Sequence, residues 1–126
     1  MRSTYFISGI MVFLSALLLL GCGEDLEKEQ LLLGKWSLEK AFRGENKTEL
    51  LNHLFFEFQE EGMMTTNINN GQLEQGKYTL SGDIIHQTES SLNLDLTLKS
   101  LTDSTLVIQT SIRGMPFEFY FVRDTL

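Results

Sequence analysis

The chain has 126 residues, of which 42% are hydrophobic, with a net charge of −7 at pH 7 and a single cysteine. This length suits one domain. The acidic balance argues against nucleic acid and anionic membrane surfaces as partners, because both attract a basic face. One cysteine cannot form an intramolecular disulfide, so a hydrophobic core must stabilise the fold.

The N-terminal segment has the layout of a secretory signal peptide. Arg2 supplies a positive charge, and residues 6–20 form an uncharged apolar run that ends before the small residue Gly21. The run of about 15 residues is shorter than the ~20 that a helix needs to cross a bilayer. We therefore predict that residues 1–21 are a cleaved signal peptide.

The end of this segment, Leu19-Leu20-Gly21-Cys22, resembles the lipobox of bacterial lipoproteins. The resemblance implies cleavage after Gly21, lipid attachment to the sulfur of Cys22, and acylation of the new amino terminus by a fatty acid such as palmitate. It places the protein in the cell envelope, anchored by lipid to the outer membrane at its periplasmic face or at the cell surface. An ordinary signal peptide, or a membrane anchor with an incidental cysteine, is the alternative.

Cleavage would leave 105 residues with a net charge of about −8. Residues 22–33 are predicted to form the lipidated cysteine and a solvated acidic tether, because residues 23–30 are polar and mostly acidic. A helical turn entering Leu31-Leu32-Leu33 is the other interpretation. An acidic run in this place resembles a surface-export signal in some Gram-negative lineages, so both sides of the outer membrane stay open.

Beyond Lys35 the sequence alternates between apolar and polar residues with a period of two, which indicates strands with one buried face. Leu92, Leu94, Leu96 and Leu98 are the clearest example. Short turn signals such as Asn70-Gly71 separate the runs. The sequence predicts eight strands, near residues 35–42, 54–60, 63–69, 75–81, 83–88, 92–100, 104–112 and 116–123.

Only one connection between these strands, residues 43–53, is long. Because the others are too short for a crossover helix, the strands must be antiparallel, with consecutive strands as neighbours. An eight-stranded meander has two open edges unless it closes on itself. We predict an all-β fold, an eight-stranded antiparallel up-and-down β-barrel over residues 34–126. A flattened sandwich or an open, half-rolled sheet is the alternative.

Three positions match the lipocalins. Gly34-Lys35-Trp36 begins the first strand, the long loop 43–53 follows that strand, and Arg123 ends the last one. Thr102-Asp103 is a partial match to a turn of that family. The chain thus resembles the small lipocalin-like (calycin-type) lipoproteins of Gram-negative bacteria. The resemblance implies that Gly34, Trp36 and Arg123 are a fold signature, in which the arginine packs across the tryptophan.

The alternation also predicts which side chains face the barrel interior. A barrel of eight strands either fills itself with side chains or holds one small ligand. These residues are therefore both the candidate core and the candidate ligand-binding residues. They are Leu38, Phe56, Phe58, Tyr78, Leu80, Leu94, Leu96, Leu106, Ile108, Phe117 and Phe119.

Catalytic signals are weak. His53 and His86 lie on separate segments, and a metal site would need further convergent ligands. No serine stands in a nucleophile-elbow context, and the glycines fall singly at turns rather than in a phosphate-binding loop. We expect no catalytic residue, no metal, no cofactor and no enzyme activity.

Two functions from different classes follow. The first is a lipid-anchored lipocalin-like protein that binds a small hydrophobic ligand in the barrel, gated by residues 43–53. The second is an envelope interaction or inhibitor protein with a filled barrel, whose acidic surface and 43–53 loop bind a macromolecule. A basic hydrolase such as lysozyme has the charge that suits this second function.

Overall fold

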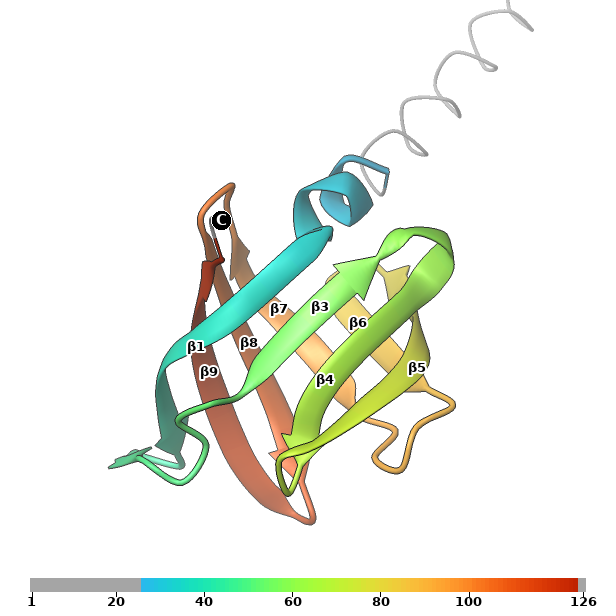
Figure 1. The fold of residues 1–126 in the computed structure, drawn as a ribbon. Coiled ribbons are helices and arrows are strands. Elements are labelled where there is room, and N and C mark those ends of the chain that lie inside the picture. Colours follow the sequence, from blue (N-terminus) through green and yellow to red (C-terminus); the bar gives the residue numbers. More distant parts are fainter. Residues whose placement is uncertain (1–25, 125–126) are drawn as a thin grey trace, which may run out of the picture.

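The computed structural model describes residues 26–124, which form a closed barrel with a helix over one end (Figure 1). Every regular element after the helix is a strand except the short 3₁₀ turn η1. The elements are β1 (Gly34–Arg43), β2 (Asn46–Thr48), β3 (Phe55–Gln59), η1 (Glu60–Gly62), β4 (Met63–Asn69), β5 (Gln72–Ser81), β6 (Ile84–Thr88), β7 (Asp95–Leu101), β8 (Thr105–Ile112) and β9 (Met115–Arg123).

The sheet is an antiparallel meander that closes through its first and last long strands. From β3 onward each strand pairs with the next in sequence, and β1 pairs with both β3 and β9. The closing register runs from Trp36 opposite Arg123 to Arg43 opposite Phe117. An irregularity at Leu38/Lys40 interrupts this pairing, and such bulges add the bend that closure requires. The predicted eight-stranded up-and-down barrel is confirmed.

The ninth strand, β2, lies outside the ring and lengthens a hairpin with the far end of β1, where Ala41 pairs with Thr48. It falls within residues 43–53, which were predicted to be a loop throughout. The sixth predicted strand, residues 92–100, also differs, since β7 begins only at Asp95. The Ser90 hydroxyl donates to the Leu92 carbonyl, and the Asn93 side chain accepts from the Ser90 N–H, so local bonds replace the sheet ladder there.

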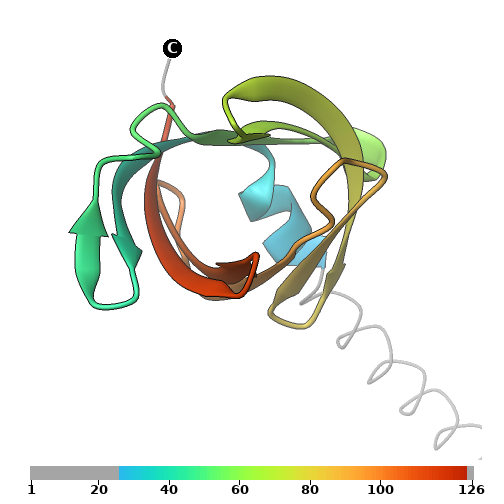
Figure 2. The ribbon, with the colours of Figure 1, turned by 90° about the horizontal axis from the view of Figure 1, so that it is seen from below.

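Residues 26–32 are helical and lie across one end of the barrel, as Figures 1 and 2 show from two directions. Leu32 is fully buried in the barrel core, whereas Leu26 is 57% exposed. In the described part of residues 22–33, the structure thus favours the other interpretation, a helical turn entering Leu31-Leu32-Leu33, over a solvated tether. Burial of Leu32, which contributes about 2 kcal/mol, draws this segment into the folded domain.

Candidate functional site

Arg123 closes the helix-covered end of the barrel. Its guanidinium carbon lies 4.2 Å from the centre of the Trp36 ring, so the predicted contact between these two residues is present. Its Nη1 and Nη2 donate to the carbonyls of Leu33 and Leu31 at 2.6 and 2.5 Å, and its Nε donates to the Asp103 carbonyl at 2.6 Å. The arginine therefore satisfies carbonyls at the end of the helix, which have no partners within the helix itself.

Gly34 makes room for this arrangement. Its φ angle is +124°, and a Cβ atom at this position would lie 2.6 Å from Nη1 of Arg123. Any larger residue would displace the guanidinium. A further side-chain bond at this end runs from Trp36 Nε1 to the Leu32 carbonyl, 2.8 Å away in the buried core. Gly34, Trp36 and Arg123 thus act together on the last residues of the helix.

All eleven predicted interior residues face the core. Leu38, Leu80 and Phe117 are partly buried against it, and the other eight are buried. Aromatic rings fill the space between the walls: neighbouring ring centres lie 5.1 to 5.9 Å apart along a continuous path from β5 to β9. In order, this aromatic path consists of Tyr78, Phe58, Phe56, Phe121, Phe119 and Phe117.

Five hollows of about 240 to 490 Å³ indent the described part of the chain, and all open to the surface. The fully buried rings of Trp36, Phe56, Phe58, Phe119 and Phe121 line none of the five. Side chains in mutual contact therefore bridge the middle of the barrel, and these five hollows lie away from its fully buried rings.

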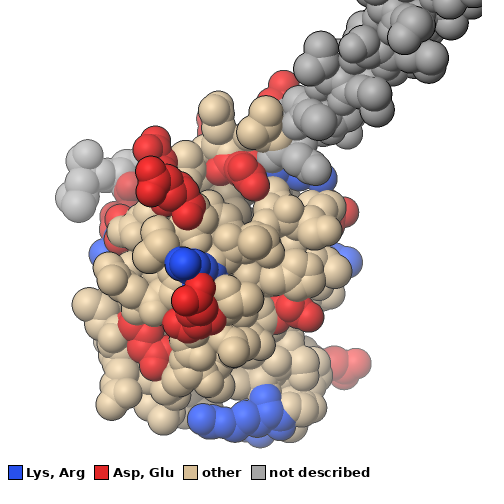
Figure 3. Space-filling model, turned by 90° about the vertical axis from the view of Figure 1, so that its right-hand side faces the viewer, with Lys and Arg blue, Asp and Glu red and all other residues tan. Residues whose placement is uncertain are grey.

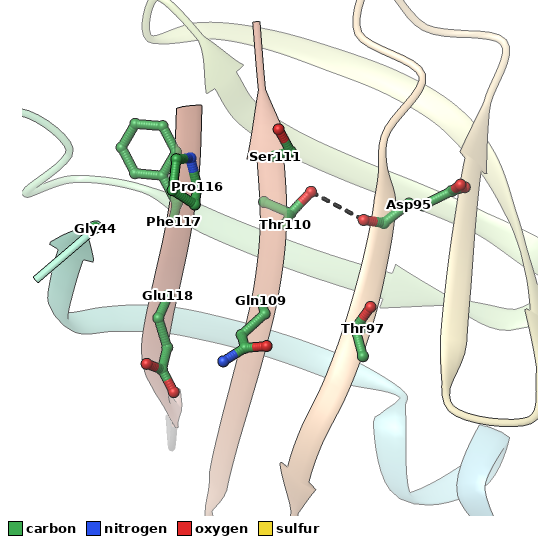
Figure 4. Close-up of a pocket in the computed structure, with 9 residues that line it drawn as sticks. All are labelled: Gly44, Asp95, Thr97, Gln109, Thr110, Ser111, Pro116, Phe117 and Glu118. Carbon is green, nitrogen blue, oxygen red and sulfur yellow. Dashed lines mark hydrogen bonds between the residues drawn. The ribbon is translucent and has the colours of Figure 1, made fainter. Parts of the chain in front are cut away.

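A polar trough of about 420 Å³ crosses the outer face of β7, β8 and β9 (Figure 4). Its polar side chains alternate with the buried ones on the same strands, which is why they face outward. The neighbouring strands bring Thr97, Gln109 and Glu118 into register across the sheet. Asp95 and Ser111 complete the hydrogen-bonding groups of the trough, and Gly44 borders it from the β1–β2 turn.

The two carboxylates of the trough already have partners beside it. Asp95 lies 2.8 Å from His86 Nδ1, and Glu118 accepts a hydrogen bond of 3.3 Å from the Tyr120 hydroxyl. Desolvation, followed by the charge and the hydrogen bond of Glu118, raises the pKa of Tyr120. Asp95 and Glu118 stand two strand spacings apart, at least about 9 Å. This arrangement presents separated acceptors suited to binding basic or hydrogen-bonding groups.

The predicted gating loop, residues 43–53, borders a second hollow of about 490 Å³ at the end of the barrel away from the helix. Leu50 projects from it with 81% exposure. Asn67 on β4 holds this loop: its Nδ2 donates to the His53 carbonyl at 2.8 Å, and its Oδ1 accepts from the Phe55 N–H at 2.9 Å. Sequence reasoning missed Asn67, because nothing in a strand pattern signals a side chain that fastens a neighbouring loop.

The remaining sequence predictions concern the N-terminal segment, the two histidines and the absence of a metal site. Residues 1–21 and Cys22 lie outside the described range. His53 lies in the loop hollow and His86 on β6, on different strands or loops as expected. Between residues 26 and 124, no three His, Cys, Asp or Glu side chains gather as metal ligands would. Over the same range, no helix has the length and apolar character needed to cross a bilayer.

The sequence was also compared with known proteins. No protein-family model matches it, and a search of curated proteins finds no match.

Proposed function

We propose that the protein is a lipid-anchored cell-envelope protein whose filled barrel is a scaffold for binding a basic macromolecular partner. The observation that carries this proposal is the aromatic path through the interior. A carrier barrel keeps its centre open for its ligand, whereas here rings in mutual contact bridge the walls, and only the two end rings of the path, Tyr78 and Phe117, border any of the five hollows.

The charge of the surface supports a basic partner. The whole chain has 17 acidic and 10 basic residues. Acidic side chains are scattered over the face seen in Figure 3, and basic side chains lie near its lower end, at its centre and at its edges. Complementary charge steers an oppositely charged protein to the surface and speeds its association. The trough supplies directed acceptors in Asp95 and Glu118.

The anchor would orient the molecule. Cys22 is four residues before Leu26, so at most about 14 Å of extended chain separates the lipid from the helix. The helix-covered end would therefore face the membrane. The 43–53 loop and the hollow beside it lie at the other end, where a partner in solution can reach them.

Membrane attachment is tested first. The full chain expressed in a Gram-negative host should partition with membranes, and mass spectrometry should find a diacylglycerol thioether on Cys22. The Cys22→Ser variant should move to the soluble envelope fraction. An unmodified thiol on membrane-bound protein would contradict the lipid anchor.

Partner binding is tested with lysozyme as the basic probe, by calorimetry on the anchored protein in detergent. We expect binding that weakens as salt is added. Neutralising the trough with Asp95→Asn and Glu118→Gln should weaken it about tenfold. The control, Glu27→Gln with Glu39→Gln, removes the same charge away from the trough and should change little. No binding, or equal losses in both variants, would exclude a specific basic-partner site.

A small hydrophobic ligand in the barrel is the second candidate. One observation favours it: Phe117, the last ring of the aromatic path, is only half-buried and borders the trough, so a ligand that displaced it would enter the core. Under this function, a fatty-acid or ANS titration should saturate and Phe117→Ala should alter it. If saturable binding occurs in the unmodified protein and lysozyme does not bind, this second candidate replaces the first.

A further inference from the structure

A hollow of about 290 Å³ lies between the helix and the η1 turn, at the opposite end of the barrel from the 43–53 loop. Figure 1 shows the helix and the turn between β3 and β4 at this same end. Glu29 from the helix, Glu60 and Glu61 from η1, and Tyr78 from β5 line the hollow. Leu26 and Leu33 add apolar surface to it.

The hollow is negatively charged. Its lining includes three carboxylates and no lysine or arginine. The nearest basic residue in sequence, Lys28, forms an ion pair with Asp83 at 3.0 Å on the other side of the helix, where a separate hollow is found. The carboxylates of this hollow are thus left facing the space between helix and turn.

Tyr78 gives a second, independent reason to expect a ligand. The residue is only 6% exposed, and its ring packs edge-on against Phe58 with centroids 5.1 Å apart. Its hydroxyl borders the hollow and forms no hydrogen bond with any residue from 26 to 124. The oxygen of this largely buried side chain is therefore open to solvent, where the N–H group of a ligand could replace water. Burial and the charge of Glu29 raise the pKa of this hydroxyl.

The backbone holds the η1 carboxylates beside Tyr78. Glu61 has a φ angle of 61°, and Gly62 has one of 70°. A Cβ atom on Gly62 would lie 3.0 Å from the Tyr78 carbonyl, so the turn packs directly on β5. The position of Glu60 and Glu61 is therefore set by the same contact that brings the turn to Tyr78.

We propose that this hollow binds a primary alkylammonium group. The ammonium would lie among Glu29, Glu60 and Glu61, the Tyr78 oxygen would accept one of its N–H groups, and the attached methylenes would pack on the leucines. Both a lysine side chain and an amine-bearing lipid headgroup have this chemistry. The site is distinct from the trough; the use of nanodiscs and the comparison of lipids below rest on the proposed lipid anchor, whereas the amine site itself does not.

The experiment titrates butylammonium chloride into the full chain, held in lipid nanodiscs, with ¹³Cζ-labelled tyrosine observed by NMR. We expect the Tyr78 resonance to shift and saturate. Tyr120, which also lies beside a carboxylate, is the internal control and should not move. Butyltrimethylammonium, which has charge but no N–H donors, should bind at least about fivefold more weakly.

Two variants test the residues. Glu29→Gln with Glu60→Gln should raise the Kd for butylammonium about tenfold, as followed by the Tyr78 resonance. Tyr78→Phe lacks that resonance and is measured by calorimetry beside the unmodified protein; it should raise the Kd about fivefold while keeping the ring in the core. Asp95→Asn with Glu118→Gln removes equal charge from the trough and should leave the Kd unchanged. Near-ultraviolet circular dichroism of each variant checks that the barrel is folded.

The source of the ammonium is tested by comparing nanodiscs of phosphatidylethanolamine with nanodiscs of phosphatidylcholine. Weaker butylammonium binding in the first would mean that a lipid headgroup occupies the site, and equal binding would point to a soluble amine or a lysine side chain. The site is disproved if Tyr78 does not respond to butylammonium in phosphatidylcholine, or if the trough variant weakens binding as much as the Glu29/Glu60 variant. Either result leaves the lysozyme experiment unaffected, so the two proposals fail separately.

Discussion

Arg123 joins three parts of the chain that are far apart in sequence: the end of the helix, the Trp36 ring and the β7–β8 turn at Asp103. Residues along β9 alternate between facing inward and facing outward, and this alternation predicts that Arg123 faces inward. The resemblance to lipocalins predicts its contact with Trp36. The bonds to the helix could not be predicted, because a strand pattern around residue 123 does not show which distant carbonyls its side chain reaches. A guanidinium suits this place, since its fixed fork of donors reaches several carbonyls at once.

Gly34→Ala tests how tightly this contact is built. The new Cβ would meet the guanidinium at 2.6 Å, so we expect a loss of at least about 2 kcal/mol in the free energy of unfolding. Gly82→Ala is the matched control: it also has a positive φ angle, +60°, but nothing lies within 4 Å of its Cβ position. Its cost should be the left-handed backbone penalty alone, about 1 kcal/mol. Urea unfolding measures both, and equal losses would show that the steric contact is unimportant.

The raised pKa values of Tyr78 and Tyr120 predict a loss of stability in base. The folded state binds both phenolic protons more tightly than the unfolded chain, whose tyrosine pKa is 10.0. Their contribution is therefore complete below pH 10 and is lost as the pH rises through the raised values. Tyrosinate absorbance in a pH titration measures this directly. Tyr78→Phe and Tyr120→Phe should each remove a late-titrating phenol; an ordinary midpoint for either would contradict the prediction.

At the scale of elements, strands were predicted more reliably than the helix. A period-two pattern such as Leu94, Leu96 and Leu98 needs only local sequence to be interpreted. The helix over residues 26–32 is polar except for its leucines, and its stability comes from Leu32, which contacts a core assembled from distant strands. The trough was missed for a similar reason: its residues meet only when three strands lie in register.

The helix should matter to stability through one side chain. Leu32→Ala empties a fully buried position and should cost about 2 to 5 kcal/mol in unfolding free energy. Leu26→Ala, on the same helix but 57% exposed, should change it by less than about 0.5 kcal/mol. Fluorescence of Trp36, the single tryptophan, follows unfolding in both variants. If the two variants had the same free energy of unfolding, Leu32 would add no more to the stability of the core than the exposed Leu26.

At the scale of the whole molecule, the closed barrel and the inward-facing residues were predictable, but the state of the interior was not. Large side chains such as Phe56 and Phe58 could line a cavity or fill it, and only the distances between their rings decide between the two. Strand closure through β1 and β9 was inferred from the cost of leaving two edges open, an argument that requires no detail of the contacts.

A filled barrel predicts that a cavity has to be made by mutation. Phe56→Ala should cost about 3 to 5 kcal/mol and should create a binding site for an apolar molecule of the size of benzene. The neighbouring Phe55, half-buried and beneath the Lys35 ammonium at 4.8 Å, is the matched control. Phe55→Ala should lose less stability and gain no benzene site, as judged by thermal unfolding with and without benzene. Similar results for both variants would mean that the interior is not tightly packed.

Closure of the barrel by its last strand has a consequence for how the protein is made. β1 is complete early in synthesis, yet its partner β9 ends at Arg123, near the carboxyl terminus, and the Asp124 N–H still bonds to the Lys35 carbonyl. The growing chain therefore carries an unpaired edge of β1, and a tryptophan without its arginine, until residue 123 has emerged. A premature stop codon anywhere in β9 would therefore produce an open sheet prone to pair with its neighbours.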